Sequence, residues 1–270
     1  MKTPFKTGCN GRVSAPPEKR IPIKISYQYK MKERIRDALR RMGVEIGGYR
    51  HTFLARRQCI FSAYGVDTVV DVGANVGQYA RMIRRGGFGG RIISFEPLTV
   101  AFDELAKCAA VDPKWDCRRV AVGAKSGNLD LNVSVNSIFT SARPLTPKSL
   151  ETDLATRILR VESVAVEPLD ALINPSPNTA VKIDVQGYED QVVAGGSEVI
   201  GAAPVVEMEI TMTPLYEEQW LIRDALAVLE DRFDLELALT ENIMPDPETG
   251  RALQINGLFV RNRIYSRSEK

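Results

Sequence analysis

The stretch "VVDVGANVGQYARMI", Val69 to Ile83, passes from an apolar, β-branched run into a helical pattern through a turn that holds two glycines. Asn75 lies between these glycines, Gly73 and Gly77. A glycine can adopt a positive φ and lacks a Cβ, so a ligand can approach the main chain closely at such a turn. The spacing G-x-x-x-G differs from the G-x-G-x-x-G of dinucleotide-binding turns, which makes phosphate binding the weaker interpretation. A tight turn without any ligand is the alternative.

Strand-like and helix-like segments alternate outward from this turn. Strands are expected at 66–72, 91–95 and 117–122, and helices at 78–85 and 99–110. Further strands are expected in "NLDLNVSV", "VESVAV", "AVKIDV", "PVVEMEI", "DLELAL" and "LFVRN", and further helices in "YEDQVVAGGSEVI" and at 217–232. This alternation predicts a mostly parallel sheet with helices on both faces. Such sheets bind ligands beyond the carboxyl ends of their strands.

Two acidic residues come at the ends of the first two expected strands. Asp71 could accept hydrogen bonds from a bound ammonium group or from the amides of its own loop. Glu96, in "IISFEPL", follows Gly77 by 19 residues, where such folds place an acid that accepts both hydroxyls of a ribose. Each charge-assisted hydrogen bond contributes roughly 1.5–3 kcal/mol, so the pair would select strongly for a ribose. A surface salt bridge is the alternative for Glu96.

Five segments, taken in order, resemble the FkbM family of S-adenosylmethionine-dependent methyltransferases: "DVGANVGQYA", "SFEP", "VAVGAKSG", "VKIDVQGYEDQVVAGG" and "VVEMEI". The resemblance covers about residues 60–260. It implies an α/β, Rossmann-like class I methyltransferase fold, with a mostly parallel, doubly wound sheet and an antiparallel C-terminal strand. The basic N-terminal region outside the resemblance is expected to form a helical appendage. The resemblance also implies S-adenosyl-L-methionine as the cofactor. Because many family members methylate hydroxyl groups of sugars or polyketides, an O-methyltransferase is expected.

The resemblance also implies which residues contact the cofactor. These are Asp71, Gly73, Asn75 and Gly77 at the methionine end, Glu96 at the ribose, and Val120 and Ala121 at the adenine.

Methyl transfer to oxygen requires an aligned acceptor and a base that removes its proton. Asp184 ends an apolar strand beside the implied methyl position and is the first candidate for the base or for an acceptor anchor. Glu207 is the second candidate, and His51, the sole histidine, is the third. Lys182 should point to the same side as Asp184, since side chains alternate along a strand. A structural ion pair is the alternative for this pair, and a structural role is the alternative for His51.

Substrate contacts are predicted from the polar segment "SVNSIFTSARPL" and from the strand ends. The predicted residues are Asn136, Ser137, Lys182 and Glu209. Family members often read "KIDVEG" where this chain has Gln186, and the departure removes one carboxylate from the site. No metal is predicted. A divalent metal held by Asp184, Glu207 and Glu209 stays open as an alternative, because oxygen ligands suit such ions.

Other enzyme classes fit less well. A nicotinamide-dependent oxidoreductase would need the absent G-x-G-x-x-G, and the chain has no Y-x-x-x-K pair. An N-methyltransferase and a non-catalytic binding module on the same fold are further alternatives. The four cysteines show no C-x-x-C spacing and are interpreted as reduced thiols.

Charge divides the chain into regions. Residues 1–50 hold 13 Lys or Arg and 4 Asp or Glu, a net +9, which leaves −7 for the rest of the chain, whose total is +2. We expect a disordered basic tail at 1–20, a basic helical appendage at 21–60 and a methyltransferase domain at 61–265. The amphipathic "YKMKERIRDALRRM" predicts a helix that packs on the domain or, alternatively, lies on an anionic membrane.

The same features set the expected partners and location. The near-neutral total charge argues against nucleic acid, and the acceptor is expected to be a small molecule, a glycolipid or a saccharide. With no signal-peptide pattern and no run approaching about 18 apolar residues, the expected location is the cytoplasm, or the inner face of the membrane if the basic helix binds it. Neither the acceptor nor the oligomeric state is encoded in these patterns.

Overall fold

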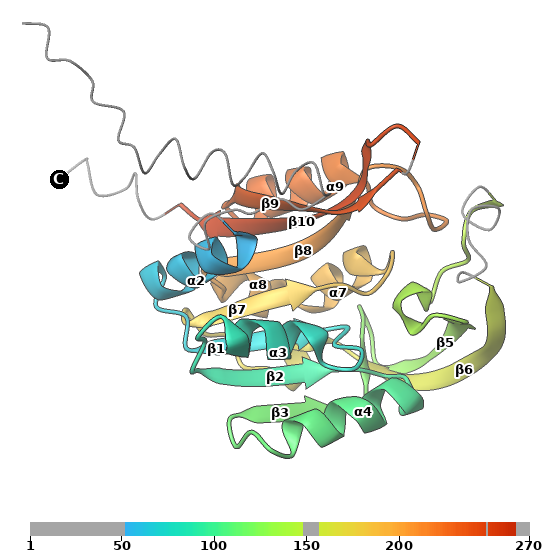
Figure 1. Cartoon of the computed structure of the whole chain (residues 1–270), viewed down its shortest axis with the longest axis horizontal. Helices are drawn as coiled ribbons and strands as arrows, with labels where there is room; N and C mark the ends of the chain where they lie inside the picture. Colours follow the sequence, from blue (N-terminus) through green and yellow to red (C-terminus); the bar gives the residue numbers. More distant parts are fainter. Residues whose placement is uncertain (1–51, 148–156, 247, 263–270) are drawn as a thin grey trace, which may run out of the picture. The chain divides into compact units, whose positions relative to one another are not determined.

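The computed structural model describes residues 52–147, 157–246 and 248–262 (Figure 1). Helix α2 (Phe53–Ala63) leads into a central sheet. The strands of this sheet are β1 (Thr68–Val72), β2 (Arg91–Phe95), β3 (Trp115–Arg118), β7 (Thr179–Ile183), β8 (Val205–Thr211), β9 (Leu235–Pro245) and β10 (Ala252–Arg261). A smaller sheet contains β4 (Ala121–Val122), β5 (Gly127–Ser134) and β6 (Ile158–Glu167). The connecting helices are α3 (Gln78–Arg85), α4 (Thr99–Ala109), α6 (Leu169–Leu172), α7 (Glu189–Gly195), α8 (Ser197–Ala202) and α9 (Ile222–Leu226), with the short η2 (Ser137–Phe139) and a π-helical segment η4 (Ala227–Arg232).

The strand order across the central sheet is β3-β2-β1-β7-β8-β10-β9 among the described residues. Strands β1, β2, β3, β7 and β8 pair in parallel, whereas β10 runs antiparallel to both β8 and β9. The predicted fold is confirmed: the sheet is mostly parallel and doubly wound, with an antiparallel C-terminal strand, as in class I methyltransferases. Chain order reverses between β1 and β7, so a crevice for a ligand is expected beyond the carboxyl ends of these two strands.

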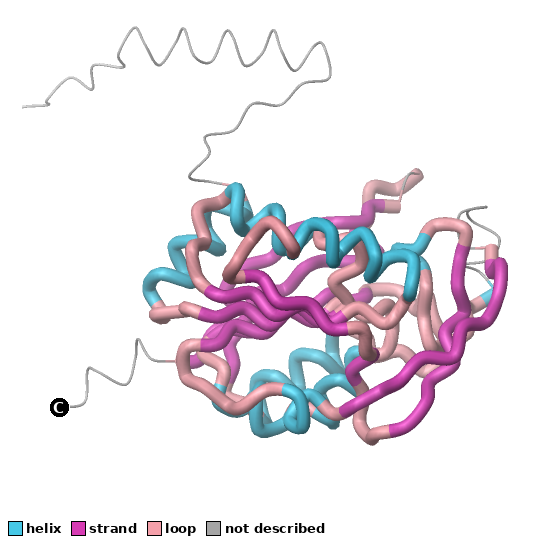
Figure 2. The backbone as a smooth tube through the Cα atoms, turned by 90° about the horizontal axis from the view of Figure 1, so that it is seen from below, coloured by secondary structure: helices cyan, strands magenta, loops and turns pink. Residues whose placement is uncertain are grey.

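Helices cover both faces of the central sheet (Figure 2). On one face, apolar side chains of α2, α3 and α4 pack on residues such as Val69 and Ile92. On the other face, α6, α7, α8 and α9 pack on residues such as Val70 and Val181. Strands buried on both sides read as nearly continuous apolar runs, which explains why these segments were recognisable.

The smaller sheet lies at the carboxyl ends of the parallel strands (Figure 1). Its inner face, with Leu131, Val133 and Val164, packs against Leu98 and Ala101 at the start of α4. This packing holds the segment that connects β5 to η2 close to the turn after β1, where Ser137 contacts Asn75.

Three expected elements differ substantially from the structure. The single helix expected in "YEDQVVAGGSEVI" is divided at Gly196 into α7 and α8. The expected strand 117–122 is divided between β3 and β4, which belong to different sheets, so Val120 lies in the connection between them. The helix expected from residue 217 begins only at Ile222. Glu218 adopts a left-handed φ of 54°, which interrupts a right-handed helix, and the carboxylate of Asp224 instead caps the Leu221 amide at 2.9 Å.

The predicted tail at 1–20 and most of the predicted appendage at 21–60 lie outside the described residues. The described part of the appendage belongs to α2, whose Phe53 is buried in the same core as α3. None of the helices formed by the described residues combines the length and the apolar character that crossing a membrane requires.

Candidate active site

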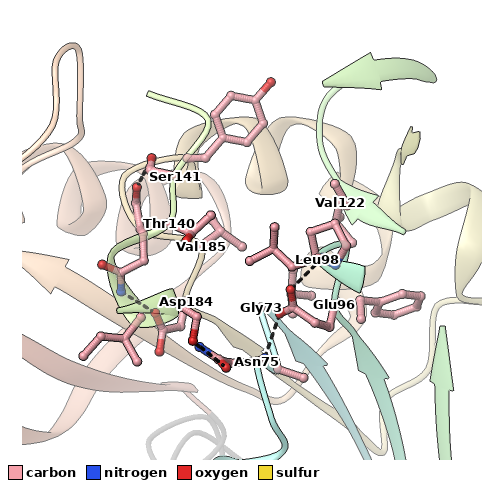
Figure 3. Close-up of a pocket in the computed structure, with 18 of the residues that line it drawn as sticks. Gly73, Asn75, Glu96, Leu98, Val122, Thr140, Ser141, Asp184 and Val185 are labelled. Carbon is pink, nitrogen blue, oxygen red and sulfur yellow. Dashed lines mark hydrogen bonds between the residues drawn. The ribbon is translucent and has the colours of Figure 1, made fainter. Parts of the chain in front are cut away.

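A cavity of about 300 Å³ opens at the carboxyl ends of β1, β2 and β7 (Figure 3). This volume is at the lower end of the roughly 300–1,000 Å³ typical of small-molecule sites. Eight of the predicted site residues line it: Gly73, Asn75, Glu96, Val120, Ala121, Ser137, Lys182 and Asp184. The cavity is also lined by Thr140 and Ser141 of the polar segment and by Gln186, whereas the sequence interpretation missed the lining residues Tyr79, Leu98 and Val122.

The glycine turn has the expected backbone but a different reason for its glycines. Gly73, Asn75 and Gly77 have φ values of 78°, 47° and 82°. A Cβ on Gly73 would lie 1.8 Å from the carbonyl oxygen of Asp184, and one on Gly77 would lie 2.8 Å from the Trp115 ring. Packing of the turn on β7 and β3 therefore requires both glycines. Gly73 still lines the cavity, whereas Gly77 is the N-cap of α3 and is not among the lining residues.

Glu96 is held rigidly at the end of β2. Its Oε2 accepts a hydrogen bond from the Asn75 amide at 2.8 Å, and its Oε1 accepts one from the Leu98 amide at 2.9 Å. The residue is only 5% exposed, and burial raises the pKa of its carboxyl to about 7 despite these two bonds. Each carboxylate oxygen can accept a second hydrogen bond, so the group retains capacity for two hydroxyl donors.

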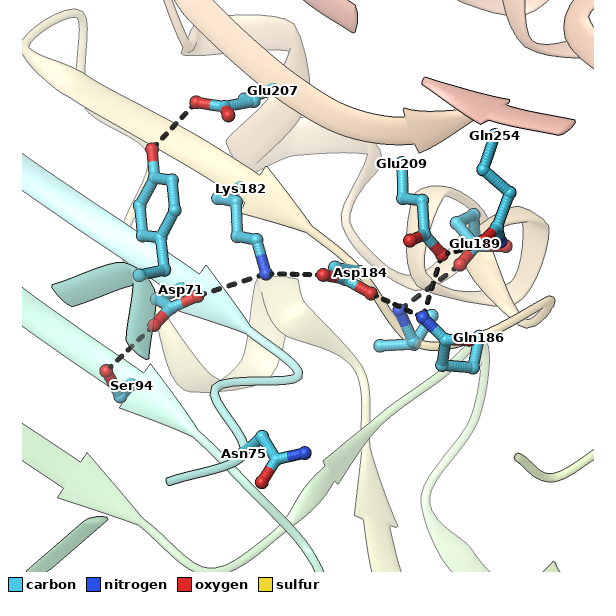
Figure 4. A network of polar contacts seen from close by, with 12 residues as sticks. Asp71, Asn75, Ser94, Lys182, Asp184, Gln186, Glu189, Glu207, Glu209 and Gln254 are labelled. Atoms are coloured by element: carbon cyan, nitrogen blue, oxygen red, sulfur yellow. Dashed lines mark hydrogen bonds and ion pairs between the residues drawn. The ribbon is translucent and has the colours of Figure 1, made fainter. Parts of the chain in front are cut away.

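A layer of polar side chains crosses the sheet beneath the cavity (Figure 4). Asp71 is in register with Ser94 on one side and with Lys182 on the other, and Lys182 is in register with Glu207. Ser94 Oγ donates to Asp71 Oδ2 at 3.3 Å, and Lys182 Nζ lies 3.6 Å from Asp71 Oδ1. Burial raises the pKa of the Asp71 carboxyl, whose Oδ1 has no hydrogen-bond partner. Asp71 is therefore a buried acid beneath the turn and is not a lining residue.

Asp184 faces the cavity and is fixed by Lys182. Lys182 Nζ donates to Asp184 Oδ2 at 3.0 Å, and the Asp184 side chain is 29% exposed. Burial lowers the pKa of Lys182, but the carboxylates of Asp184 and Asp71 raise it by more, so the net pKa is above its usual value. The ammonium group thus stays charged and orients an accessible carboxylate.

Glu207, the second candidate base, is bound by Arg57 and Tyr79 outside the cavity. Its carboxylate accepts hydrogen bonds from Arg57 Nε at 2.7 Å and from Arg57 Nη2 at 2.6 Å. The hydroxyl of Tyr79 donates to it as well, at 2.8 Å. Arg57 is 1% exposed, and Glu207 does not line the cavity. The geometry gives Glu207 a structural role that joins α2 and α3 to β8.

Glu209 lies behind Asp184 rather than in the cavity wall. Its Oε2 accepts hydrogen bonds from Gln186 Nε2 at 2.8 Å and from Gln254 Nε2 at 3.2 Å. Burial raises its pKa well above the usual value, and the nearby carboxylates Asp184 and Glu189 add to the effect.

Only some residues of the polar segment "SVNSIFTSARPL" line the cavity. Asn75 Nδ2 donates to Ser137 Oγ at 3.2 Å, which ties the loop to the glycine turn. Asn136 is exposed, and its Oδ1 accepts from the Ile138 amide at 3.2 Å as the cap of η2. His51 lies outside the described residues. No group of three or more His, Cys, Asp or Glu side chains suited to a metal ion occurs within the described ranges.

The strand order and this crevice define the class of fold: a Rossmann-like class I methyltransferase. The model of a protein family described as "Methyltransferase FkbM domain" matches residues 71–235, which is more than half of the chain. The chain belongs to the FkbM methyltransferase family, which confirms the resemblance.

Several solved structures are similar to the chain. One is the FkbM methyltransferase of Methylobacillus flagellatus KT, at 16% identity and a TM-score of 0.49, over 72% of this chain and 44% of that one. TehB of Haemophilus influenzae matches at 8% identity and a TM-score of 0.41, over 76% of this chain and 62% of that one. An rRNA methylase of Streptococcus thermophilus matches at 8% identity and a TM-score of 0.44, over 79% and 99%. The chain thus spans less than half of the Methylobacillus protein. No protein of curated function matches it.

Proposed function

We propose that the protein is an S-adenosylmethionine-dependent O-methyltransferase that methylates a hydroxyl of a sugar, in a glycolipid, a polysaccharide or a glycosylated natural product. The observation that carries this proposal is the pairing of two carboxylates in one cavity. Glu96 lies at one side and the partly exposed Asp184 at the other (Figure 3).

The residues around Glu96 fit an adenosyl group. Its two carboxylate oxygens, each already bound to one backbone amide, would accept the ribose hydroxyls. The neighbouring wall is apolar, as a purine requires, and consists of Leu98, Val120, Ala121, Val122, Leu129 and Leu131. Asp71 does not line the cavity and is paired with Lys182, so it would act on the methionine end only through the charge it adds beneath the turn. When bound, the cofactor supplies a methyl group activated by a sulfonium.

Asp184 is the proposed base. Its carboxylate is accessible from the cavity and would accept the proton of the acceptor hydroxyl, while Lys182 fixes its orientation. A positioned base typically contributes about 10²–10⁴-fold to the rate. The hydroxyls of Ser137 and Thr140 line the same cavity and would bind hydroxyls of the sugar. Neither Asn136 nor Glu209 lines the cavity, so neither is part of the proposed acceptor site.

Two assays test this function. Calorimetry with S-adenosylmethionine measures cofactor binding, and transfer of a tritiated methyl group to a panel of methyl glycosides measures turnover. Asp184→Asn should lower turnover by about 100-fold or more while cofactor affinity changes by less than about threefold. Unchanged turnover in Asp184→Asn would remove the base assignment. If turnover occurs only on amine acceptors, the enzyme is an N-methyltransferase and the O-methylation proposal fails.

Treatment with EDTA tests the metal-assisted alternative. Glu207 is bound to Arg57, and Asp184 and Glu209 share the amide of Gln186, so these acids are already engaged. We therefore expect EDTA to leave turnover unchanged. A loss of turnover that manganese or magnesium restores would instead support a metal-assisted reaction.

A further inference from the structure

The side chain of Gln186 joins the two carboxylates that lie nearest to it (Figure 4). Its Nε2 donates to Asp184 Oδ1 at 2.9 Å and to Glu209 Oε2 at 2.8 Å. Its Oε1 accepts from the Tyr216 hydroxyl at 3.0 Å. Both donors and one acceptor position of the amide are therefore used within the protein.

The orientation of this amide follows from its surroundings. Two carboxylates face one end of the side chain and a phenolic hydroxyl faces the other. Only the NH₂ group can donate to both acids, and an amide oxygen turned toward them would leave two acceptors opposed to a third. The side-chain geometry thus uses both donors and the acceptor oxygen of a glutamine amide.

The backbone conformation also holds Gln186 in this position. Its φ of 57° is left-handed, which a residue with a side chain seldom adopts. Neighbouring contacts hold it there: the Ser141 hydroxyl donates to the Gln186 carbonyl, and the Gly187 amide donates to Glu189 Oε1 at 3.1 Å. A side chain held by its backbone and by three partners has little freedom to serve a mobile ligand.

Charge explains why an amide suits this position. Three carboxylates surround it, from Asp184, Glu209 and the buried Glu189, with Asp71 and Glu207 farther along the same layer. The cations nearby are Lys182, which binds Asp184 on its other oxygen, and Arg57, which binds Glu207. A glutamate at position 186 would replace both donors by a carboxylate oxygen about 3 Å from Asp184 and from the buried Glu209, so that these acids could no longer all ionise without mutual repulsion.

We propose that Gln186 is a positioning residue whose amide bridges Asp184 to Glu209, so that the Asp184 carboxylate is held facing the acceptor. The proposal rests on the proposed function in one respect, namely that Asp184 is the base. The bridge itself is a property of the folded protein and can be tested without any acceptor.

The first test compares thermal unfolding across pH in the unchanged protein, Gln186→Glu and Gln191→Glu. Gln186→Glu keeps the size of the side chain but replaces both donors by an acceptor. Gln191→Glu is the matched control, because Gln191 Nε2 also donates to a carboxylate, Asp190 Oδ2 at 2.7 Å, which Arg143 binds as well. Both variants add one negative charge, and only the first adds it beside the buried Glu209.

The expected direction follows from proton binding. A buried acid whose pKa is raised in the folded protein, as for Glu209, releases its proton at higher pH than in the unfolded chain, so stability falls as pH rises toward the folded value. Gln186→Glu should steepen this fall. Its Tm deficit relative to the unchanged protein should be at least about 3 °C larger at about pH 8.5 than at about pH 6. If Tm falls with pH in Gln186→Glu as it does in the unchanged protein, or if Gln191→Glu steepens this fall equally, the proposed bridge is wrong.

The second test measures cofactor affinity and the pH dependence of turnover, which report on the positioning role. Affinity for S-adenosylhomocysteine should change by less than about threefold in Gln186→Glu, because the amide contacts Asp184 and not Glu96. In the glycoside assay, the acidic limb of the pH–rate profile should move to higher pH, since a carboxylate that loses a donor and gains an anionic neighbour binds its proton more tightly. An unshifted profile would overturn the positioning role. If the unchanged protein transfers no methyl group, the proposed function fails, and the unfolding curves still decide the bridge.

Discussion

Gly73 shows how a single backbone position joins the turn to the rest of the site. Its φ of 78° disfavours any side chain, and a Cβ would lie 1.8 Å from the carbonyl oxygen of Asp184. Gly73→Ala should therefore destabilise the protein by about 4 kcal/mol or more, the range of severe backbone and packing defects. Urea unfolding measures the change in the free energy of unfolding.

Gly65 provides the control for this substitution. It has a similar φ of 66°, but a Cβ there would meet nothing within 4 Å. Gly65→Ala should cost only the conformational penalty of about 1–2 kcal/mol. Equal losses in the two variants would show that the close approach of the turn to β7 is not what requires Gly73.

Glu96 should make cofactor binding depend on pH. Burial raises the pKa of its carboxyl to about 7, whereas a ribose hydroxyl donates best to the ionised form. Binding then releases a proton below this pKa, so affinity for S-adenosylhomocysteine should rise by up to about tenfold from pH 6 to pH 8 and then level off. Calorimetry at several pH values measures it. Glu96→Gln should bind more weakly and with a flat profile, and an unchanged slope in that variant would assign the pH dependence to another group.

Among single residues, the sequence predicted those whose position follows directly from a neighbouring strand. Glu96 and Asp184 each follow an apolar strand directly, so the sheet edge places them without further information. Gln186 was noticed only as a departure from the family pattern. Its partner Glu209 lies 23 residues away, and its left-handed backbone depends on contacts that no local pattern encodes.

Helix α2 is joined to the sheet by one buried ion pair. Arg57 binds both carboxylate oxygens of Glu207, and its guanidinium carbon lies 5.2 Å from the centre of the Tyr79 ring. Arg57→Ala leaves the carboxylate buried without its cation and should cost about 3–5 kcal/mol in the free energy of unfolding. Denaturant unfolding measures this loss.

The neighbouring Arg56 is the control, because it is exposed on the same helix. Arg56→Ala should change stability by no more than about 0.5 kcal/mol. The double variant Arg57→Met with Glu207→Leu should recover part of the loss, since it removes both buried charges together. A loss in Arg57→Ala as small as in Arg56→Ala would contradict a structural role for the pair.

Helices and strands were likewise predicted where the local sequence marks them, and missed where contacts between distant residues decide. The expected β2 and α3 coincide with the observed bounds, because continuous apolar runs and a glycine start mark them. The division of 117–122 between two sheets was missed, since both halves are strand-like and only distant pairing with β2 and β6 separates them. The Arg57–Glu207 pair spans 150 residues and has no local signature.

For the whole molecule, the charge asymmetry makes a separate prediction. Residues 1–50 carry a net +9, and basic amphipathic segments bind anionic membranes. If the basic helix lies on an anionic membrane and does not simply pack on the domain, the full chain should co-sediment with vesicles that contain anionic lipid, and a variant lacking residues 1–45 should stay in solution. Because that deletion ends before α2, the variant should bind S-adenosylhomocysteine as the full chain does. Equal sedimentation of both proteins would rule out a membrane role for the basic segment.

The central claim is that the cavity between the glycine turn and Glu96 holds an adenosyl cofactor. A crystal structure of the protein with S-adenosylhomocysteine tests it most directly. We expect the ribose hydroxyls within hydrogen-bond distance of Glu96, the purine against Leu98 and Val122, and the sulfur on the side of Asp184. A nucleoside bound elsewhere, or a cavity that stays closed to it at saturating ligand, would contradict the account.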